Sequence, residues 1–258
     1  MVIRNVVFAV TLVVPFFAFA WGEPSVQVEG TKYEAKLNLF VKEETKRGTV
    51  LVLNGCNGPR DMHYTEWAKY LNEIGYNAIV VNSFDTRGLR NICPIRGNRS
   101  YSYDSVPDAI SVAHWVRKQD WSNGKVDAIG FSLGGITTLL LASHEPDETY
   151  KTAFDGVVAY YPTCREEMQT RKTEIPLQVH IGSIDEWASA DRCKALQATE
   201  GFKSSEFNYY ENTHHLFDGR SGGSAICYKG VPCAYGPNKE ANDLSRERVK
   251  AFLARTLN

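Results

Sequence analysis

Residues 125–136 read Lys125-Val126-Asp127-Ala128-Ile129-Gly130-Phe131-Ser132-Leu133-Gly134-Gly135-Ile136. The segment contains the pattern G-x-S-x-G, preceded by apolar residues typical of a buried strand and followed by a long apolar run typical of a helix. Glycines on both sides of Ser132 let a strand and a helix approach each other without a Cβ clash. The pattern therefore predicts a strand over 125–130, a helix over 133–144, and a sharp turn that exposes the serine hydroxyl. A glycine-rich turn whose serine only caps the helix is the structural alternative.

The rest of the chain alternates between strand and helix patterns. Apolar or alternating runs predict an opening hairpin within 26–41 and strands at 49–53, 77–81, 154–160, 175–181 and 207–210. Apolar residues at helical spacing predict helices at 67–74, 106–121, 191–199 and 240–257. Strands that alternate with helices form crossover units, so we expect an α/β fold with a mostly parallel central sheet and helices on both faces. Chemistry in such sheets lies in the loops that follow the strands.

Two of these loops contain the partners that a nucleophilic serine needs. A serine hydroxyl requires a general base, and the base requires a carboxylate to orient it. In a fold with this turn, an acid and then a histidine follow the serine in chain order, each after a later strand. The strand predicted to end at residue 181 is followed by Gly182-Ser183-Ile184-Asp185-Glu186-Trp187, and the one ending at 210 by Glu211-Asn212-Thr213-His214-His215-Leu216-Phe217-Asp218. Asp185 and either His214 or His215 therefore stand where a catalytic triad requires them.

The first twenty residues differ in composition from the rest of the chain. Arg4 is their only charged residue, residues 6–20 are almost wholly apolar, and the segment ends Ala18-Phe19-Ala20. This layout is typical of a secretory signal peptide, and about 15 apolar residues are fewer than the roughly 20 that a spanning helix needs. We expect cleavage after Ala20, a single domain over 21–258, and a periplasmic or secreted protein with no membrane segment after cleavage. A retained membrane anchor is the alternative.

Composition and cysteine content narrow the class of protein. The 258 residues carry a formal net charge of −1, with 43% hydrophobic and 23% charged residues. These values are ordinary for a globular protein and exclude a disordered chain, a collagen-like repeat and a polybasic nucleic-acid binder. Export makes disulfides the expected state of the six cysteines. Proximity favours the pair Cys227–Cys233, and the simplest pairing of the others is Cys56–Cys93 and Cys164–Cys193.

Five segments resemble the dienelactone hydrolase family of α/β-hydrolases, particularly its exported, cysteine-containing members. The matching segments are 53–58, 82–88, 130–135, 182–187 and 210–217. The resemblance implies an α/β-hydrolase fold and the hydrolysis of a small carboxylic ester or lactone. Two departures stand out: the original family members use a cysteine nucleophile where this chain has Ser132, and the first loop reads Asn54-Gly55 where α/β-hydrolases often have His-Gly. An amide side chain can still hold that loop by hydrogen bonds.

The resemblance also implies the role of each site residue. It selects Asp185 as the acid, with Glu186 as the neighbouring alternative. It selects His215 over His214 as the base, because the family's histidine precedes one residue and then a phenylalanine. The backbone N–H groups of Leu133 and Cys56 would form the oxyanion hole.

Other residues are assigned more loosely. By resemblance, Arg87 would grip a substrate carboxylate, and a structural loop arginine is the alternative. Trp187, with Tyr101, Tyr103 and Tyr161, would line an apolar pocket or belong to the core. His63 and His180 lie in no motif and are expected at the surface or in the core. Residues 218–238 are expected to form a surface loop, closed by a disulfide, that borders the entrance to the site.

We therefore expect a serine hydrolase that cleaves a small ester or lactone through an acyl-enzyme. It needs no metal or organic cofactor, its partner is a small-molecule substrate rather than nucleic acid, and its oligomeric state is left open. A peptidase or amidase on the same fold is one alternative. A non-catalytic binding protein that retains the fold is another, and a metal site at His214, His215 and Asp218 is a weaker one.

Overall fold

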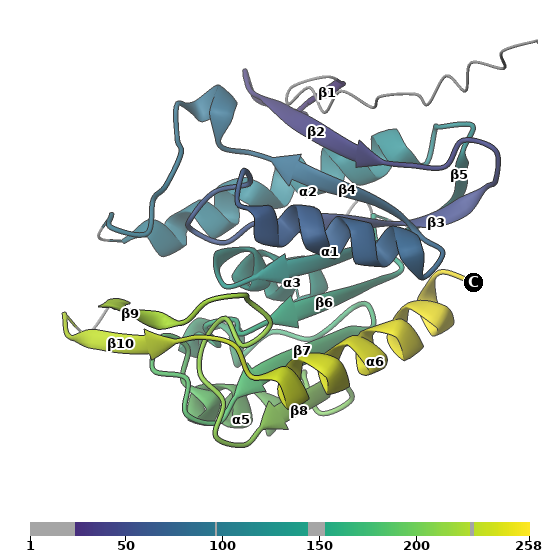
Figure 1. Ribbon diagram of the computed structural model, residues 1–258. Coiled ribbons are helices and arrows are strands. Elements are labelled where there is room, and N and C mark those ends of the chain that lie inside the picture. The colour runs from purple at the N-terminus through teal and green to yellow at the C-terminus, as the bar shows by residue number, and fades with distance from the viewer. Residues whose placement is uncertain (1–23, 96, 144–152, 228–229) are drawn as a thin grey trace, which may run out of the picture.

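The computed structural model describes residues 24–95, 97–143, 153–227 and 230–258. Its centre is an eight-stranded sheet with the order β1-β2-β4-β3-β5-β6-β7-β8 (Figure 1). The strands are β1 (Ser25–Gln27), β2 (Glu34–Phe40), β3 (Arg47–Leu53), β4 (Asn77–Asn82), β5 (Ser122–Phe131), β6 (Gly156–Tyr160), β7 (Leu177–Gly182) and β8 (Glu206–Tyr210). A second, two-stranded sheet consists of β9 (Gly223–Ile226) and β10 (Pro232–Tyr235). The helices are α1 (Met62–Glu73), α2 (Tyr101–Val116), α3 (Leu133–Ser143), α5 (Ala190–Gln197) and α6 (Lys239–Thr256), with short 3-10 turns η1 (Asp85–Arg87), η2 (Asn98–Ser100) and η3 (Glu166–Met168).

The central sheet is parallel from β4 to β8, and β1 and β2 run antiparallel at one edge. Every residue of β4, β6 and β7 is buried. Complete burial is typical of parallel strands that are covered on both faces. The arrangement confirms the expected α/β fold with a mostly parallel sheet.

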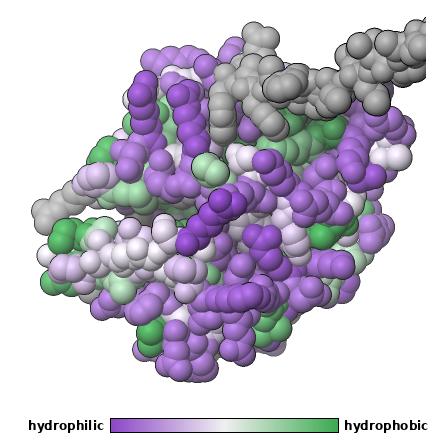
Figure 2. Space-filling model, viewed as in Figure 1, coloured by the Kyte–Doolittle hydropathy of each residue, from purple (hydrophilic) through white to green (hydrophobic). Residues whose placement is uncertain are grey.

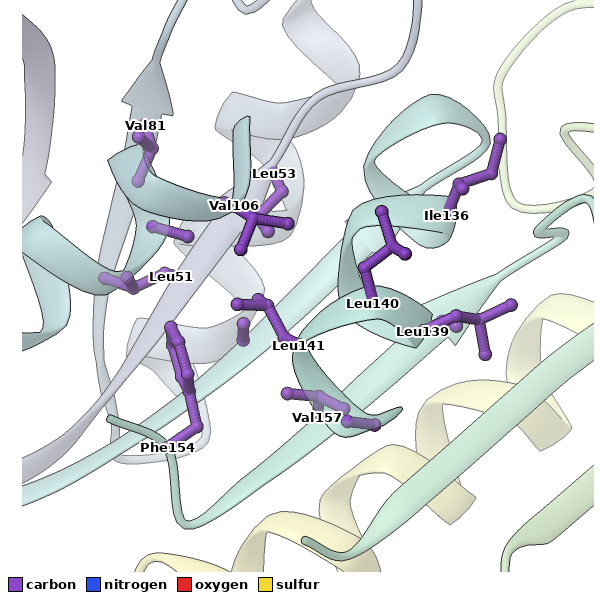
Figure 3. Close-up of a cluster of buried hydrophobic side chains, with 14 of the residues drawn as sticks. Leu51, Leu53, Val81, Val106, Ile136, Leu139, Leu140, Leu141, Phe154 and Val157 are labelled. Atoms are coloured by element: carbon purple, nitrogen blue, oxygen red, sulfur yellow. The ribbon is translucent and has the colours of Figure 1, made fainter. Parts of the chain in front are cut away.

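Helices cover both faces of the sheet, and the side chains of each strand alternate between them. In β3, Leu51 and Leu53 pack with residues of α2 and α3, whereas Val50 and Val52 pack with residues of α1 and α6. Figure 3 shows part of the first cluster, in which leucines of α3 are drawn together with Leu51 and Leu53 of β3 and Val157 of β6. All of α3 is buried, so this helix lacks the exposed polar face of a surface helix.

Several element boundaries differ from the sequence expectation; for example, α1 begins at Met62 instead of residue 67, and α2 ends at Val116 instead of residue 121. Helix α2 begins at Tyr101 instead of residue 106 and runs through Pro107, so the packing of its first turns outweighs the loss of one helical hydrogen bond. Residues 218–238, expected to be a loop, contain the antiparallel pair β9 and β10. All of β9 is exposed, so this strand lacks the alternation of buried and exposed residues by which strands are recognised.

The six cysteines form three disulfides, Cys56–Cys93, Cys164–Cys193 and Cys227–Cys233, the same pairs that the sequence favoured. The expected signal peptide lies outside the described residues. Within the described ranges, no helix combines the length and hydropathy needed to cross a membrane.

Candidate active site

Ser132 lies between the end of β5 and the start of α3 in a left-handed backbone conformation, with φ of 52°. The glycines around it are required because backbone segments touch at this point. A Cβ atom on Gly130 would lie 2.1 Å from the carbonyl oxygen of Gly134, and one on Gly134 would lie 2.3 Å from the carbonyl oxygen of Leu53. A strained serine at a tight strand-to-helix turn is the geometry that the G-x-S-x-G pattern predicts.

Three side chains from three different loops meet at this turn. Ser132 follows β5, Asp185 follows β7 and His215 follows β8, so the parallel strands deliver them to one edge of the sheet. His215 Nε2 lies 3.0 Å from Ser132 Oγ, and His215 Nδ1 lies 2.7 Å from Asp185 Oδ2. Because the carboxylate only accepts hydrogen bonds, Nδ1 carries the proton and Nε2 is free to accept one from the serine hydroxyl.

The second oxygen of Asp185 is held by the loop that carries it. Oδ1 accepts hydrogen bonds from the backbone N–H groups of Trp187 and Ala188, each at 2.8 Å. These bonds fix the carboxylate in the orientation that meets His215. The alternative acid, Glu186, binds elsewhere, since its Oε2 accepts from the backbone N–H of Ala234.

The alternative base, His214, points to a different place from His215. It lines a surface cleft together with Ser183, Asp185 and Asp191, and among the described residues it makes no hydrogen bond to Ser132 or Asp185. The structure thus joins Ser132, His215 and Asp185 by hydrogen bonds and leaves both alternatives outside that chain of contacts.

The loop after β3 lies against the serine turn and is held in place by side chains. The hydroxyl of Tyr64 accepts a hydrogen bond from the Gly55 N–H at 2.7 Å and donates one to Asn57 Oδ1 at 2.5 Å. Asn54 Nδ2 donates to the Gly55 carbonyl oxygen at 2.8 Å, the role expected of an amide in place of the usual histidine. Cys56 is tied to Cys93 by a disulfide.

The backbone N–H groups without acceptors among the described residues of this region include those of Leu133, the first residue of α3, and of Cys56. A helix N-terminus and an adjoining loop are the usual sources of oxyanion-hole donors. Tyr64, which holds this loop, was missed by sequence reasoning, because nothing in the helical pattern of 67–74 marks its hydroxyl as different from that of any core tyrosine.

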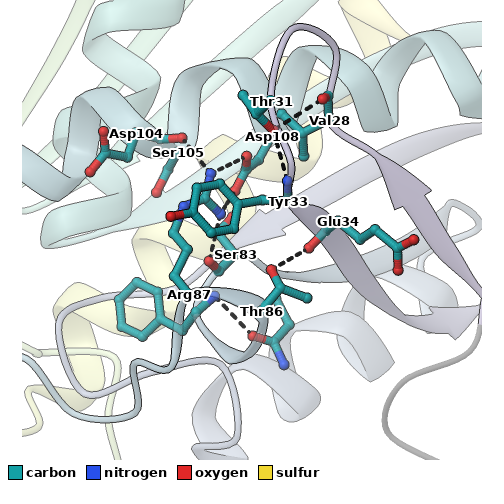
Figure 4. Close-up of polar contacts among 12 residues, drawn as sticks. Val28, Thr31, Tyr33, Glu34, Ser83, Thr86, Arg87, Asp104, Ser105 and Asp108 are labelled. Carbon is teal, nitrogen blue, oxygen red and sulfur yellow. Dashed lines mark hydrogen bonds and ion pairs between the residues drawn. The ribbon is translucent and has the colours of Figure 1, made fainter.

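Arg87 binds another protein side chain. Its Nη1 and Nη2 donate to the two carboxylate oxygens of Asp108 at 2.7 and 2.8 Å, and Nη1 also donates to the Ser83 carbonyl oxygen at 2.7 Å (Figure 4). The guanidinium packs on the ring of Tyr33, 4.5 Å from its centroid. Burial raises the pKa of Asp108, and the bonds from Arg87 oppose that rise. These contacts match the structural alternative for Arg87.

Aromatic rings and the small sheet border the histidine. The ring centroids of Tyr161 and Trp187 lie 4.5 and 5.8 Å from that of His215. Trp187 Nε1 donates to the Cys233 carbonyl oxygen at 3.3 Å, and the Gly236 N–H donates to the His215 carbonyl oxygen at 2.9 Å. The hairpin of β9 and β10 is therefore attached to the loops of both the acid and the base.

The outer part of this hairpin is apolar and exposed. Figure 2 shows hydrophobic side chains at the edge of the molecule where Figure 1 places the hairpin, and Ile226 and Val231 are 64% and 48% exposed. An element expected to be a bordering loop thus forms an apolar rim beside the site.

Comparisons with known proteins agree with this fold. A carboxymethylenebutenolidase from Pseudomonas putida is 30% identical over 117 residues, which are 43% of this chain and 46% of that protein, so the chain spans about half the length of the curated relatives it matches. Among solved structures, a dienelactone hydrolase-like promiscuous phosphotriesterase from metagenomic libraries has a TM-score of 0.70 at 19% identity, covering 93% of this chain and 99% of that one. Thermogutta terrifontis esterase 2 phosphorylated by paraoxon has a TM-score of 0.63 at 17% identity, covering 89% and 93%.

At 19% and 17% identity, the likeness to these two structures shows a shared fold and nothing about activity. The match to the dienelactone hydrolase family itself covers residues 38–257, from within β2 to beyond the end of α6, and it includes Ser132, Asp185 and His215. This chain therefore belongs to the dienelactone hydrolase family.

Proposed function

We propose that this protein is a serine hydrolase that cleaves carboxylic esters or lactones through an acyl-enzyme. The observation that carries the proposal is the continuous chain of contacts from Asp185 Oδ2 through His215 to Ser132 Oγ, at a strained strand-to-helix turn. Family membership supports the same class of chemistry.

The reaction proceeds in two halves. His215 Nε2 takes the proton of Ser132 as Oγ attacks the carbonyl carbon, and the N–H groups of Leu133 and Cys56 stabilise the oxygen that becomes negative. The carbon–oxygen bond to the alcohol breaks, and His215 gives its proton to the leaving oxygen. Water, deprotonated by His215, then attacks the acyl carbon. The bond to Ser132 Oγ breaks, His215 returns the proton to Oγ, and the acid is released. Asp185 keeps the imidazole in the reactive tautomer throughout.

We expect the preferred substrate to be uncharged near the scissile bond. The arginine that would recognise a substrate carboxylate has its guanidinium paired with Asp108, a buried side chain. The rings that pack beside His215 are those of Tyr161 and Trp187, which carry no charge. The relatives named carboxymethylenebutenolidase support a lactone as one substrate type.

The proposal is tested with p-nitrophenyl esters, neutral lactones and lactones carrying a carboxylate, on purified protein with its disulfides intact. Ser132→Ala should lower kcat at least about 10³-fold and abolish labelling by a fluorophosphonate probe. Ser183→Ala, which removes a serine after β7 outside the triad, is the matched control and should keep the wild-type rate. Wild-type protein that neither hydrolyses esters nor reacts with the probe would refute the proposal.

The choice of base is tested in the same assay. His215→Ala should lose activity as severely as Ser132→Ala, because nucleophile and base act as one unit. His214→Ala should retain it, because His214 faces the neighbouring cleft. Equal losses in both histidine variants would contradict the assignment.

We also propose that the protein works outside the cytoplasm. All six cysteines are in disulfides, which persist in oxidising compartments and are rare in the cytosol. Fractionation of cells expressing the full chain, compared with a chain that begins at Trp21, should find only the full chain in the exported fraction. Retention of the full chain in the cytosol would contradict this.

A further inference from the structure

A buried carboxylate outside the triad lies close to the catalytic base. The side chain of Asp218, three residues after His215, has no solvent exposure. Its Oδ2 accepts a hydrogen bond from Trp67 Nε1 at 2.7 Å, and its Oδ1 accepts one from the Tyr161 hydroxyl at 2.9 Å. His63 Nε2 lies 3.3 Å from Oδ2, within ion-pair distance but without hydrogen-bond geometry. The reaction described above uses none of these groups.

The surroundings of Asp218 keep it ionised. Burial alone would raise its pKa, but the charge of His63 and the bonds from Trp67 and Tyr161 outweigh burial and lower the pKa of Asp218. For His63 the effects have the opposite sign. Burial alone would lower the pKa of this histidine, but the negative charge of Asp218 outweighs burial and raises the pKa. A buried carboxylate is costly unless paired and hydrogen-bonded, and here two donors bind it and the imidazole of His63 lies within ion-pair distance.

One of these donors also contacts the catalytic histidine. The ring centroid of Tyr161 is 4.5 Å from that of His215. Tyr161 follows β6 with φ of 38°, a conformation that bulky residues rarely adopt, and its backbone N–H donates to the His180 carbonyl oxygen at 2.7 Å. Strained residues of this kind persist only where their surroundings fix them, and they cluster at functional sites.

We propose that Asp218 is a positioning residue, which anchors the Tyr161 hydroxyl so that the Tyr161 ring holds the His215 imidazole in line with Ser132. The inference rests on the proposed function. Asp218 sits behind the base as a fixed, charged acceptor, and Tyr161 transmits its position to the imidazole. His63 and Trp67 hold the carboxylate from α1, the helix that follows the oxyanion loop.

The substitution Tyr161→Phe removes the bond to Asp218 and keeps the ring. Freed from its anchor, the ring no longer fixes the imidazole, so kcat should fall about tenfold or more while KM changes little, and fluorophosphonate labelling should slow by the same factor. Tyr210→Phe is the matched control. It removes a buried tyrosine hydroxyl that bonds His180 Nδ1 at 2.7 Å, within the same aromatic cluster but without contact to Asp218 or His215.

The variant Asp218→Asn and the double variant with Tyr161→Phe complete the test. If the two residues act as one unit, the double variant should lose no more activity than the more affected single variant. Should Asp218→Asn fail to fold, the comparison of Tyr161→Phe with Tyr210→Phe still tests whether the bond from Tyr161 to Asp218 supports catalysis. Unchanged kcat in a folded Tyr161→Phe protein, or an equal loss in Tyr210→Phe, overturns the role of Asp218. Wild-type protein that does not react with the probe overturns the proposed function as well.

Discussion

Lowering the pH from 7 to 5 should destabilise this protein through His180, a fully buried residue of β7. Its Nδ1 lies 2.7 Å from the Tyr210 hydroxyl and its Nε2 lies 2.9 Å from Gln178 Oε1, while the ring stacks on Tyr160 with centroids 4.7 Å apart. Burial, with the positive charge of Arg248 as a second cause, lowers the pKa of His180 from 6.5 to about 3. The folded protein thus keeps this imidazole neutral.

The size of the effect follows from proton uptake. In the unfolded chain the histidine binds a proton near pH 6.5, whereas the folded protein resists protonation until about pH 3. Between these values the unfolded state binds more protons, so stability is complete above pH 6.5 and is lost as the pH falls. Each pH unit corresponds to about 1.4 kcal/mol, which gives a loss of about 2 kcal/mol at pH 5 and about 5 kcal/mol near pH 3.

The assay is urea unfolding of wild type and His180→Gln at pH 7.5, 6 and 5, followed by tryptophan fluorescence. Glutamine does not titrate. Between pH 7.5 and pH 5 the free energy of unfolding of the variant should therefore fall by about 2 kcal/mol less than that of wild type, whatever its value at pH 7.5. Val179→Ala, a cavity-forming change at the neighbouring buried position, is the control. Its free energy of unfolding should fall on acidification by as much as that of wild type. Equal losses in wild type and His180→Gln would refute the reasoning.

Three further changes test other contacts. Asp185→Asn should lower kcat by about 10⁴-fold without altering the unfolding curve, because an amide cannot hold His215 in the reactive tautomer; steady-state kinetics and urea unfolding check both parts. Arg87→Ala should lower the free energy of unfolding by about 3–5 kcal/mol, because it leaves Asp108 buried without its partner; a specific loss of activity toward carboxylated substrates with stability unchanged would contradict this. Burial raises the pKa of Asp127 well above its usual 3.8, so wild type loses stability as the pH rises above that value. Asp127→Asn should therefore raise the midpoint of thermal unfolding at pH 7 and give no gain at pH 3.

The parts of the site that the sequence predicted are those determined by local backbone geometry. The glycines around Ser132 are required by contacts within a few residues, and chain order then points to Asp185 and His215 after later strands. The choice of His215 over His214 came from the family likeness, because two adjacent histidines in a loop cannot be told apart by periodicity.

The parts that the sequence did not reveal depend on partners far away in the chain. Arg87 donates to Asp108, which lies 21 residues away in the sequence, and Trp67 donates to Asp218, which lies 151 residues away. An arginine in a loop has the same sequence signature whether it binds a substrate or a buried aspartate. Pairing of this kind depends on how the helices pack on the sheet. That packing cannot be inferred from a single sequence.

The proposed catalytic base, His215, is attached to an edge of the sheet. His215 follows β8, which pairs only with β7 among the strands described and is half-buried along most of its length. Ser132, in contrast, follows β5 in the middle of the sheet. Edge segments open locally at lower free energy than central strands. The proposed nucleophile and base therefore belong to regions of different local stability. On heating, we expect the proposed hydrolytic activity to be lost through fraying of β8 while most of the core is still folded.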